Sequence, residues 1–436
     1  MSYPSELPAR KARPVDAAER YLSLDTLRGV AVLGILVMNI YVFAMPFPAY
    51  NNPLIMGGTE IHNLGTWVFT HIVADQKFYS IFSMLFGAGL ILMMQRAELR
   101  GARFGPIYYR RMFWLMVLGL LHAYLIWFGD ILFYYSVMGM IVFLFRNVRP
   151  RRLIVTACLL MLVPIFINYG SSLFIEELQQ EGIELQELSA AGEELDEEQE
   201  AMLEQWVTMK PFVAPSEELL QEDIAAYKGS YVDALEQRAT TVVTMQMQWL
   251  PTFVVWRIGG LMLLGMALMK LGIISGERDV DFYKRLALAG YGIGLPLAGF
   301  SAVDLFAHNF DAIYFFRYGN ITNYVAAVFV ALGHLAVVNL AVKTGVLKRM
   351  TDRFAAVGRM ALSNYLAHSI VMTLIFYGYG LGLYAEVPRF WQQGFVIALI
   401  TAQLLVSPWW LEHFRFGPVE WAWRSLTYWE RQPMRQ

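Results

Sequence analysis

Ten long apolar runs constrain this chain more than any other feature of its sequence. A helix needs about 20 apolar residues to cross the hydrocarbon core of a bilayer. The runs lie at residues 26–45, 79–95, 110–128, 131–146, 152–169, 242–269, 284–304, 318–342, 356–380 and 391–411. The fold class that they predict is an all-α, polytopic membrane bundle of about ten transmembrane helices.

Composition supports a membrane protein, and the residue types present argue against an intramolecular disulfide and a metal site. Hydrophobic residues make up 57% of the 436 residues and charged residues only 16%, whereas soluble domains average about 25% charged residues. The single cysteine, Cys158, lies in an apolar run and can form no intramolecular disulfide. No spacing of His, Cys, Asp or Glu resembles a metal site, so we expect no metal. We expect the lipid bilayer, and not nucleic acid, as a partner, and a homo-oligomer stays open.

Loops rich in Lys and Arg alternate along the chain with loops that are poor in both. The basic clusters lie at residues 10–20, 96–111, 146–152, 270–285, 343–353 and 415–435. Short cytoplasmic loops of membrane proteins are enriched in these residues. With an even number of spans, the alternation predicts that both termini are cytoplasmic. The polar N-terminus leads directly into a full-length apolar run, so we expect no cleavable signal peptide.

These patterns divide the chain into five regions. They are a cytoplasmic tail at 1–20, a first membrane half at 21–170, an acidic extracytoplasmic insert at 171–240, a second membrane half at 241–412 and an interfacial C-terminal segment at 413–436. Within the insert, Glu176–Trp206 places Leu, Ile and Met near helical spacing among Glu and Gln. That pattern predicts amphipathic helices in water, which form a solvated cap or an interaction surface.

The first span carries three polar residues that could form a site. Asp25 and Arg28 are three positions apart, so they can pair on one helix face, or Arg28 can meet an anionic ligand at the cytoplasmic side. Asn39 follows Arg28 by eleven residues, which is about three turns and about 16 Å along the axis. The two side chains therefore share a face, which suits a path through the bundle. A hydrogen bond between helices explains Asn39 equally well.

Other spans hold ionisable residues, which in a membrane indicate function by default. His122 and His368 each serve as a general base or as a structural hydrogen-bonding group. Arg257 needs an anion, for which Asp130, Asp304 and a bound substrate are the candidates. Asp130 also suits the N-cap of the fourth span. Arg359 opens the ninth span, where Asn364 and His368 share a face.

Four stretches together resemble one family. Leu24–Gly29 followed by Asn39-Ile40, Lys77–Gly89, Gly119–His122 with Gly129–Leu132, and Phe414–Trp421 with Trp423–Tyr428 are similar to the YeiB-like family, domain-of-unknown-function family 418. The resemblance covers most of the chain. It implies a multi-pass protein of a bacterial inner membrane. The family has no settled activity, and its members are often called transporters.

The opening motif is also similar, more distantly, to the first span of membrane acyltransferases. These include the acyltransferase-3 enzymes and the heparan-α-glucosaminide N-acetyltransferase. They share an Arg-Gly pair and a polar residue eleven positions after the arginine, which is asparagine in the heparan enzyme, as Asn39 is here. That enzyme also has a functional histidine in the following loop, where this chain has Tyr50, Asn51 and Asn52.

Two functions follow from these residues and this resemblance. In an acyltransferase, acyl-CoA as donor would dock near Arg28, Arg110 and Arg359, and its acyl group would pass Asn39, His122 and His368 to a small-molecule, lipid or glycan acceptor. In a transporter of a small anion, lipid or metabolite, Arg257 and the midplane histidines would form the site. The substrate-binding candidates are Asp25, Arg28, Asp130, Arg257, Asn364 and Arg359. A structural or signalling protein that uses its acidic insert is a third interpretation.

Overall fold

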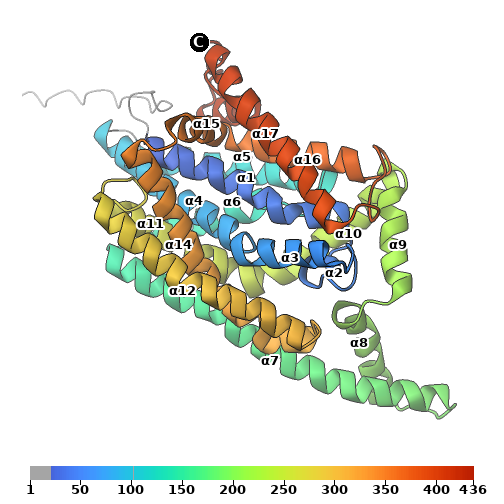
Figure 1. The fold of residues 1–436 in the computed structure, drawn as a ribbon. Coiled ribbons are helices and arrows are strands. Elements are labelled where there is room, and N and C mark those ends of the chain that lie inside the picture. The colour runs from blue at the N-terminus through green and yellow to red at the C-terminus, as the bar shows by residue number, and fades with distance from the viewer. Residues whose placement is uncertain (1–20, 102) are drawn as a thin grey trace, which may run out of the picture.

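The computed structural model describes residues 21–101 and 103–436, and the regular secondary structure of this part of the chain is helical, apart from one isolated bridge between Phe414 and Arg435. The all-α prediction is confirmed. Figure 1 shows a bundle of roughly aligned helices from which one long helical arm projects. The cytoplasmic tail predicted at 1–20, with Arg10, Lys11, Arg13 and Arg20, lies outside the described residues.

The helices follow the predicted apolar runs closely. The principal ones are α1 (Leu22–Ala44), α3 (Ile61–Val73), α4 (Lys77–Leu99), α5 (Phe104–Leu125), α6 (Leu132–Val142), α7 (Pro150–Ala190), α10 (Tyr231–Trp249), η3 (Leu250–Ile258), α11 (Gly259–Lys270), α12 (Val280–Ala307), η4 (Phe315–Gly319), α14 (Asn320–Thr344), α16 (Ala361–Phe376) and α17 (Arg389–His413). Within residues 21–101 and 103–436, seven continuous helical segments are long and apolar enough to cross a membrane, and Leu132–Phe145 and Ala361–Phe376 are shorter apolar helices. The count of ten spans stays a prediction.

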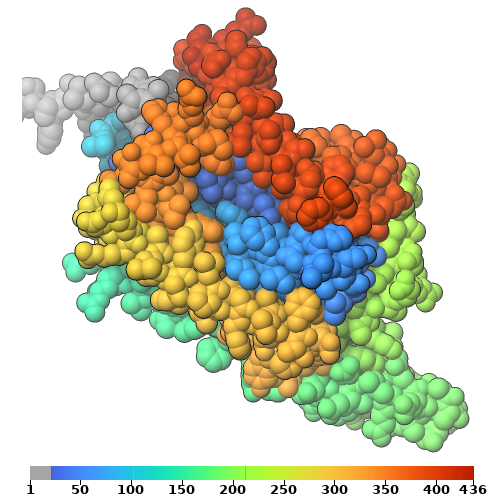
Figure 2. Space-filling view, viewed as in Figure 1, coloured from blue at the N-terminus to red at the C-terminus, as the bar shows by residue number. Residues whose placement is uncertain are grey.

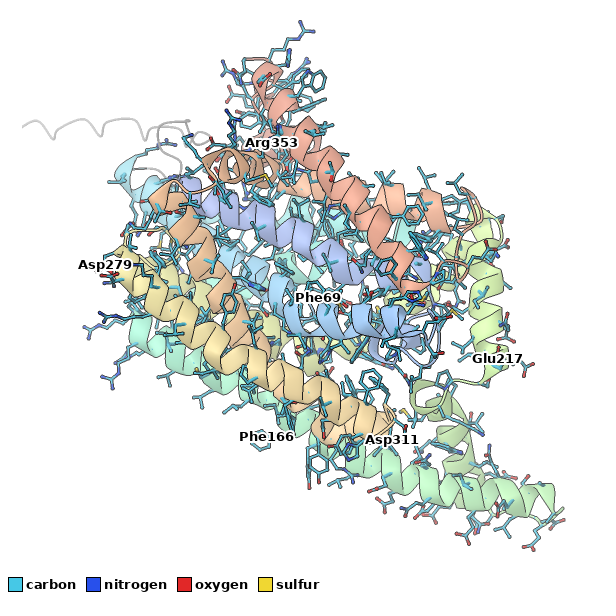
Figure 3. All side chains as sticks on the ribbon, in the orientation of Figure 1. Phe69, Phe166, Glu217, Asp279, Asp311 and Arg353 are labelled. Atoms are coloured by element: carbon cyan, nitrogen blue, oxygen red, sulfur yellow. The ribbon has the colours of Figure 1, made fainter. Side chains whose placement is uncertain are left out.

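The position of each helix in the bundle follows from how much of its surface is apolar. In α1, 78% of the most apolar stretch is buried, against 22% in α7 and in α17. A helix that is apolar on every side is stable only where neighbours surround it. Figure 2 shows α1 largely covered by other helices. On α7, by contrast, Phe166 points away from the bundle (Figure 3) and is 73% exposed. A ring so placed suits contact with lipid.

Glycines bring two pairs of helices into backbone contact. A Cβ on Gly29 of α1 would lie 1.9 Å from the carbonyl oxygen of Phe354, and one on Gly358 would lie 1.9 Å from that of Asp25. Both Phe354 and Gly358 belong to α15 (Lys348–Arg359). Gly87 of α4 and Gly265 of α11 make the same kind of contact, with carbonyl distances of 2.0 and 1.9 Å. Small residues allow membrane helices to approach this closely, so these crossings fix the centre of the bundle.

The predicted insert begins within a membrane helix. The predicted boundary at residue 170 falls inside α7, whose 41 residues continue without a break into the acidic segment (Figure 1). α8 (Glu197–Val213) and α9 (Glu217–Lys228) follow, and Asp196 caps α8 by accepting from the backbone N–H groups of Glu198 and Gln199. Arg238 of α10 is fully buried and donates to the carbonyls of Tyr124 and Ile126. It therefore ties the insert to the end of α5.

Two segments differ from the prediction. The loop expected between residues 45 and 77 contains α3, which the Pro-, Asn- and Gly-rich start of that loop obscures. The span expected at 356–380 breaks at Met360, where α15 ends and α16 begins. Glu420 of α18 (Pro418–Tyr428) accepts from the backbone N–H groups of Leu362 and Ser363, at 2.7 and 3.1 Å. A buried carboxylate thus satisfies the start of α16, which is why the helix restarts there.

Candidate functional site

A cavity of about 250 Å³ opens at the end of the bundle that carries the basic clusters, here called the basic end. Its walls come from α1, α4, α5, α6, α15, α16 and α18. The deeper wall is apolar and includes Phe82, Leu85, Phe86, Leu90, Met112 and Leu115. Six arginines line the same cavity: Arg28, Arg96, Arg111, Arg359, Arg415 and Arg424. The described carboxylates that line it are Asp25 and Glu420, so arginines outnumber carboxylates among its described lining residues, beside an apolar interior.

The glycine crossing of α1 and α15 places two of these arginines. Arg28 precedes Gly29, and Arg359 follows Gly358, so both guanidinium groups leave the crossing beside the cavity. Arg28 donates to Asp25 at 3.0 Å, and the arginine side chain is 30% exposed. The structure therefore shows the predicted Asp25–Arg28 pair, and it also places that pair at a cavity.

Aromatic rings hold further arginines at the basic end. The guanidinium of Arg111 lies 3.8 Å from the ring centre of Trp423, whose indole N–H donates to the Arg111 carbonyl at 3.0 Å. The guanidinium of Arg424 lies 4.6 Å from the ring centre of Phe416. Stacking on a ring leaves guanidinium N–H groups able to bind an anion. Arg110, expected near a donor, lies instead over Trp429 at 5.5 Å, outside the lining residues.

His122 is part of a buried polar chain. Its Nδ1 lies 2.7 Å from Oδ2 of Asp130, and its Nε2 lies 2.8 Å from Oγ of Ser369. The other oxygen of Asp130 accepts from the backbone N–H of Phe133 at 2.7 Å, which is the helix-start role expected of this residue. The predicted residues His122 and Asp130 therefore meet, and the structure adds Ser369 of α16.

His368 and Asn364 of α16 both bond to side chains of α17. Nε2 of His368 bonds to Oε1 of Gln403 at 2.8 Å, and the Gln403 amide donates to the carbonyl of Asn364 at 3.0 Å. The Asn364 amide donates to Ser407 and to the carbonyl of Val357, both at 3.2 Å. These bonds join α16 to α17, so they fit the structural alternative for both predicted residues.

Asn39 and Arg28 do not meet at one cavity. Arg28 lines the cavity at the basic end, whereas the residues that line it do not include Asn39. Asn39 is half-buried in α1, and its neighbour Met38 lines a second cavity toward the other end of the bundle. The shared helix face predicted from their spacing exists, but it connects two different regions.

Arg257 lies in η3 and is only 1% exposed. Its Nη2 donates to the carbonyl of Tyr324 at 2.8 Å, its Nε to the Tyr79 hydroxyl at 3.4 Å, and its guanidinium lies 3.8 Å from the Tyr324 ring centre. The expectation that Asp130 or Asp304 pairs with Arg257 is wrong. Asp130 binds His122, and Asp304 accepts from Tyr314, so carbonyl, hydroxyl and ring groups replace the carboxylate.

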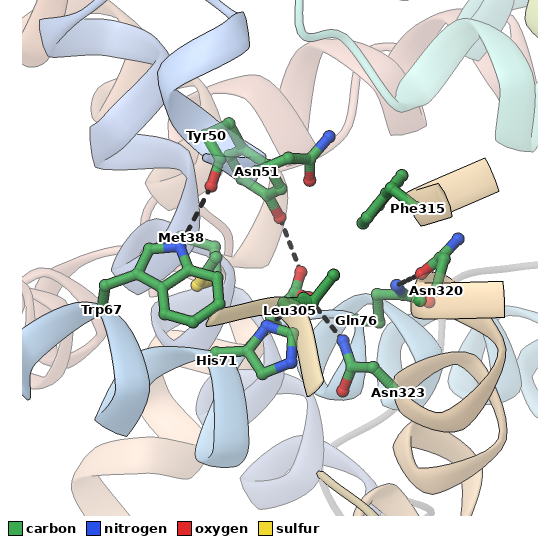
Figure 4. Close-up of a pocket in the computed structure, with 12 residues that line it drawn as sticks. Met38, Tyr50, Asn51, Trp67, His71, Gln76, Leu305, Phe315, Asn320 and Asn323 are labelled. Atoms are coloured by element: carbon green, nitrogen blue, oxygen red, sulfur yellow. Dashed lines mark hydrogen bonds and ion pairs between the residues drawn. The ribbon is translucent and has the colours of Figure 1, made fainter. Parts of the chain in front are cut away.

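A second polar cluster, here called the outer cluster, lies between α3, α4 and α14, toward the end opposite the basic clusters (Figure 4). Lys77 is fully buried and donates to Asn323 and to the carbonyl of His71, and Asn323 donates to Asp75 at 2.6 Å. Tyr50 donates to the other oxygen of Asp75 at 2.9 Å. The cavity beside these groups measures about 10 Å³, enough for about one water molecule.

Sequence reasoning missed the outer cluster and Ser369. Asp75 and Lys77 stood at the assumed end of a loop, where charges need no explanation, and α3 turns that loop into the interior. Two charges only two positions apart at the start of a long apolar run were the available signal. Ser369 carried no signal, because a serine in a span is common and its partner His122 is 247 positions away.

The apolar helices, their exposed lipid-facing side chains and the buried charges between them define an α-helical integral membrane protein. A family described as "Protein of unknown function (DUF418)" matches residues 268–430. YxaH of Bacillus subtilis is 33% identical over 97% of this chain and 98% of its own length. YeiB of Escherichia coli is 31% identical over 94% of this chain and 96% of its own length.

A third relative, described as an uncharacterized 39.9 kDa protein in the amylase 3' region of Bacillus acidopullulyticus, is 24% identical over 97% of both chains. The curated descriptions of YxaH and YeiB also call them uncharacterized. The chain belongs to the YeiB-like family of DUF418 membrane proteins, as the four sequence stretches predicted.

Proposed function

We propose that this protein is a membrane acyltransferase that takes its acyl group from cytoplasmic acyl-CoA. The observation that carries the proposal is the cavity at the basic end, where six arginines and an apolar wall line the same space. Acyl-CoA has the matching chemistry, since its phosphates suit guanidinium groups and its acyl chain gains from burial against apolar walls. Known relatives are bacterial, so we place the protein in the bacterial cytoplasmic membrane with both termini cytoplasmic.

The acceptor would reach the protein from the other side of the bundle. The outer cluster supports this part of the proposal, because Tyr50, Asn51, Gln76 and Asn320 line its cavity with hydroxyl and amide groups. Such groups bind the hydroxyls of a sugar or a lipid headgroup. The cavity is too small for such a molecule as it stands, so binding of the acceptor requires the outer helices to separate.

Transport of a small anion is the second candidate. The observation that favours it is that two buried cations, Lys77 and Arg257, lie near one buried carboxylate, Asp75. η3 and η4 are π-helical, a distortion often found at functional sites. A transported anion would neutralise this charge, and its binding would not depend on the cavity at the basic end.

One glycine allows a clean test of the donor cavity. Gly89 lines the cavity, yet a Cβ added there would meet no atom within 4 Å. Gly89→Phe should therefore fill the space without disturbing the fold. Gly292 of α12 is equally free of neighbours and lies on the exposed side, so Gly292→Phe is the matched control.

The experiment measures binding of acetyl-CoA and palmitoyl-CoA to the purified protein in detergent, with coenzyme A and anionic phospholipid as competitors. We expect the wild-type protein and Gly292→Phe to bind an acyl-CoA and to transfer or hydrolyse its acyl group. Gly89→Phe should lose that binding. Equal binding by all three forms, or binding by none, would overturn the proposal. Displacement by phospholipid alone would assign the cavity to a lipid.

A further inference from the structure

Ser369, His122 and Asp130 form a continuous hydrogen-bonded chain inside the bundle. The serine hydroxyl lies 2.8 Å from His122 Nε2, and the Asp130 carboxylate lies 2.7 Å from His122 Nδ1. Their exposed fractions are 0%, 2% and 3%. Three different segments supply them: α16, α5 and the turn before α6. Such a meeting depends on the tertiary fold and not on local sequence.

The surrounding contacts hold the Asp130 carboxyl group against His122. Asp130 is held through its other oxygen by the backbone N–H of Phe133 at 2.7 Å. A Cβ on Gly119 of α5 would lie 2.3 Å from that same nitrogen and 2.9 Å from Asp130 Oδ1, so only glycine lets α5 approach. An ionised carboxylate can only accept hydrogen bonds. His122 then donates from Nδ1, and its Nε2 accepts the proton of the Ser369 hydroxyl.

A hydroxyl, a base and an orienting carboxylate in this order form an activated nucleophile. We propose that Ser369 is the nucleophile of a covalent acyl-enzyme, with His122 as its general base and Asp130 as the positioning residue. This inference rests on the acyl transfer proposed above and specifies its mechanism. It replaces a direct transfer past Asn39 and His368, because His368 bonds to Gln403 and belongs to the contact between α16 and α17.

The two half-reactions balance without any further reactant. Ser369 Oγ attacks the thioester carbonyl carbon while its proton moves to His122 Nε2. The tetrahedral intermediate then expels the thiolate of coenzyme A, which takes the proton from Nε2 and leaves an ester on Ser369. In the second half, an acceptor hydroxyl or amine gives its proton to Nε2 and attacks the ester carbon. Ser369 Oγ leaves and takes that proton back.

Tyr365 lies beside both the donor cavity and His122. Tyr365 lines the cavity, and its ring centre lies 5.4 Å from that of His122. It precedes Ser369 by four residues, so both lie on one face of α16. Its hydroxyl donates to the carbonyl of Gly129 and accepts from the backbone N–H of Ile131, each at 3.3 Å. Such long bonds are weak, so rotation of this ring can connect the cavity to Ser369.

The distance of Ser369 from the arginines along α16 suits the length of an acyl-CoA donor. It lies eight residues into α16 from Ala361, which lines the cavity near Arg359. Eight residues correspond to about 12 Å along the helix. With its phosphates at the arginines, acyl-CoA would carry its thioester down the cavity on the extended pantetheine arm. The thioester would then come close to Tyr365, which is one of the lining residues.

The test combines two labels on the full-length protein in detergent. One is an alkyl fluorophosphonate, which reacts with activated serines independently of coenzyme A. The other is radiolabelled palmitoyl-CoA, with acid quenching and peptide mass spectrometry to find the ester. We compare the wild-type protein with Ser369→Ala, Ser369→Cys and Asp130→Asn. Ser407→Ala is the control, because it removes another buried serine of the same helix pair.

We expect both labels on Ser369 in the wild-type protein and in Ser407→Ala, none in Ser369→Ala, and recovery of an acyl adduct in Ser369→Cys. Asp130→Asn should label more than about 100-fold more slowly while it binds acyl-CoA as tightly as before. Turnover of palmitoyl-CoA by Ser369→Ala at the wild-type rate would overturn the acyl-enzyme and leave acyl transfer standing. If no form binds acyl-CoA, the proposed function fails, and the fluorophosphonate alone decides whether Ser369 is a nucleophile.

Discussion

The outer cluster and the cavity at the basic end differ in how their charged side chains are surrounded. In the outer cluster, Lys77, Asn323 and Asp75 bond to one another around a void of about 10 Å³. At the basic end, six arginines and two carboxylates line a cavity of about 250 Å³. In the outer cluster the charged groups are bonded within the protein, so deleting one of them leaves buried partners uncompensated. At the basic end the arginines line a space in which an anionic group can meet them. We therefore expect substitutions in the first region to act mainly on stability and substitutions in the second mainly on donor binding.

Removal of Lys77 should give the largest effect and should act on stability alone. Lys77→Met leaves Asn323 and the His71 carbonyl without their shared donor, and it breaks the chain of bonds that continues from Asn323 to Asp75. Breaking a buried charged network by deleting one member costs about 3–5 kcal/mol. Thermal unfolding in detergent measures the loss, with the exposed Lys343→Met as the control. If Lys77→Met keeps its melting temperature but loses acyl-CoA binding, the outer cluster contributes to binding and not to stability.

Removal of Arg28 should act on binding and little on stability. Its side chain is 30% exposed and its bond to Asp25 lies within one helix turn, so Arg28→Met should fold normally. A hydrogen bond to a charged ligand group contributes about 1.5–3 kcal/mol. We therefore expect acyl-CoA to bind at least about tenfold more weakly, as measured by titration calorimetry. Arg278→Met, at another basic loop outside the cavity, should bind as the wild-type protein does.

Glu420 bears on both ligand binding and stability, because it lines the cavity and also caps α16. Glu420→Ala should destabilise the protein by about 1–2 kcal/mol, the usual cost of a lost helix cap. Glu420→Gln should cost less, because its amide oxygen still accepts from Leu362. Chemical unfolding of α16, followed by hydrogen exchange, distinguishes the two variants. Equal loss in both would show that charge, and not capping, is the contribution of Glu420.

The same residue predicts a pH dependence. Burial raises the pKa of Glu420 above its ordinary value, so the folded protein binds this proton more tightly than the unfolded chain does. The resulting stability is fully present below the ordinary carboxyl pKa and is lost as pH rises through the raised folded pKa. Glu420→Gln should flatten this part of the melting curve against pH. An unchanged slope in Glu420→Gln would assign the dependence to another group.

The smallest effect should come from the insert. Asp196 caps α8, and Figure 1 shows α8 beside the projecting end of α7. Asp196→Ala should destabilise that helix by about 1 kcal/mol, seen as faster hydrogen exchange in α8 only. Acyl-CoA binding and the melting temperature of the bundle should stay as they are. A change in either would show that the insert takes part in the donor site.

The sequence predicted the bundle well because apolar length is a local property. The ends of α1 and α17 fall within a few residues of the predicted runs. The contacts within the sites were harder to predict, because they depend on which helix faces meet in the folded protein. Spacing correctly paired Asp25 with Arg28, but it could not show that a tyrosine ring and carbonyls satisfy Arg257. Nor could it join Ser369 to His122, since α5 and α16 meet only in the fold.

The continuity of α7 has a mechanical consequence. Its 41 residues extend about 60 Å, about twice the thickness of the hydrocarbon core. With the insert outside the membrane, as the sequence predicts, this one helix would set the height of α8 above the lipid surface, and a thicker bilayer would tilt or bend α7. Pro164 lies within α7, and since proline removes one backbone hydrogen bond and favours a kink, bending would concentrate there. Because of the length of this helix, the position of the acidic insert relative to the lipid surface would change with membrane thickness.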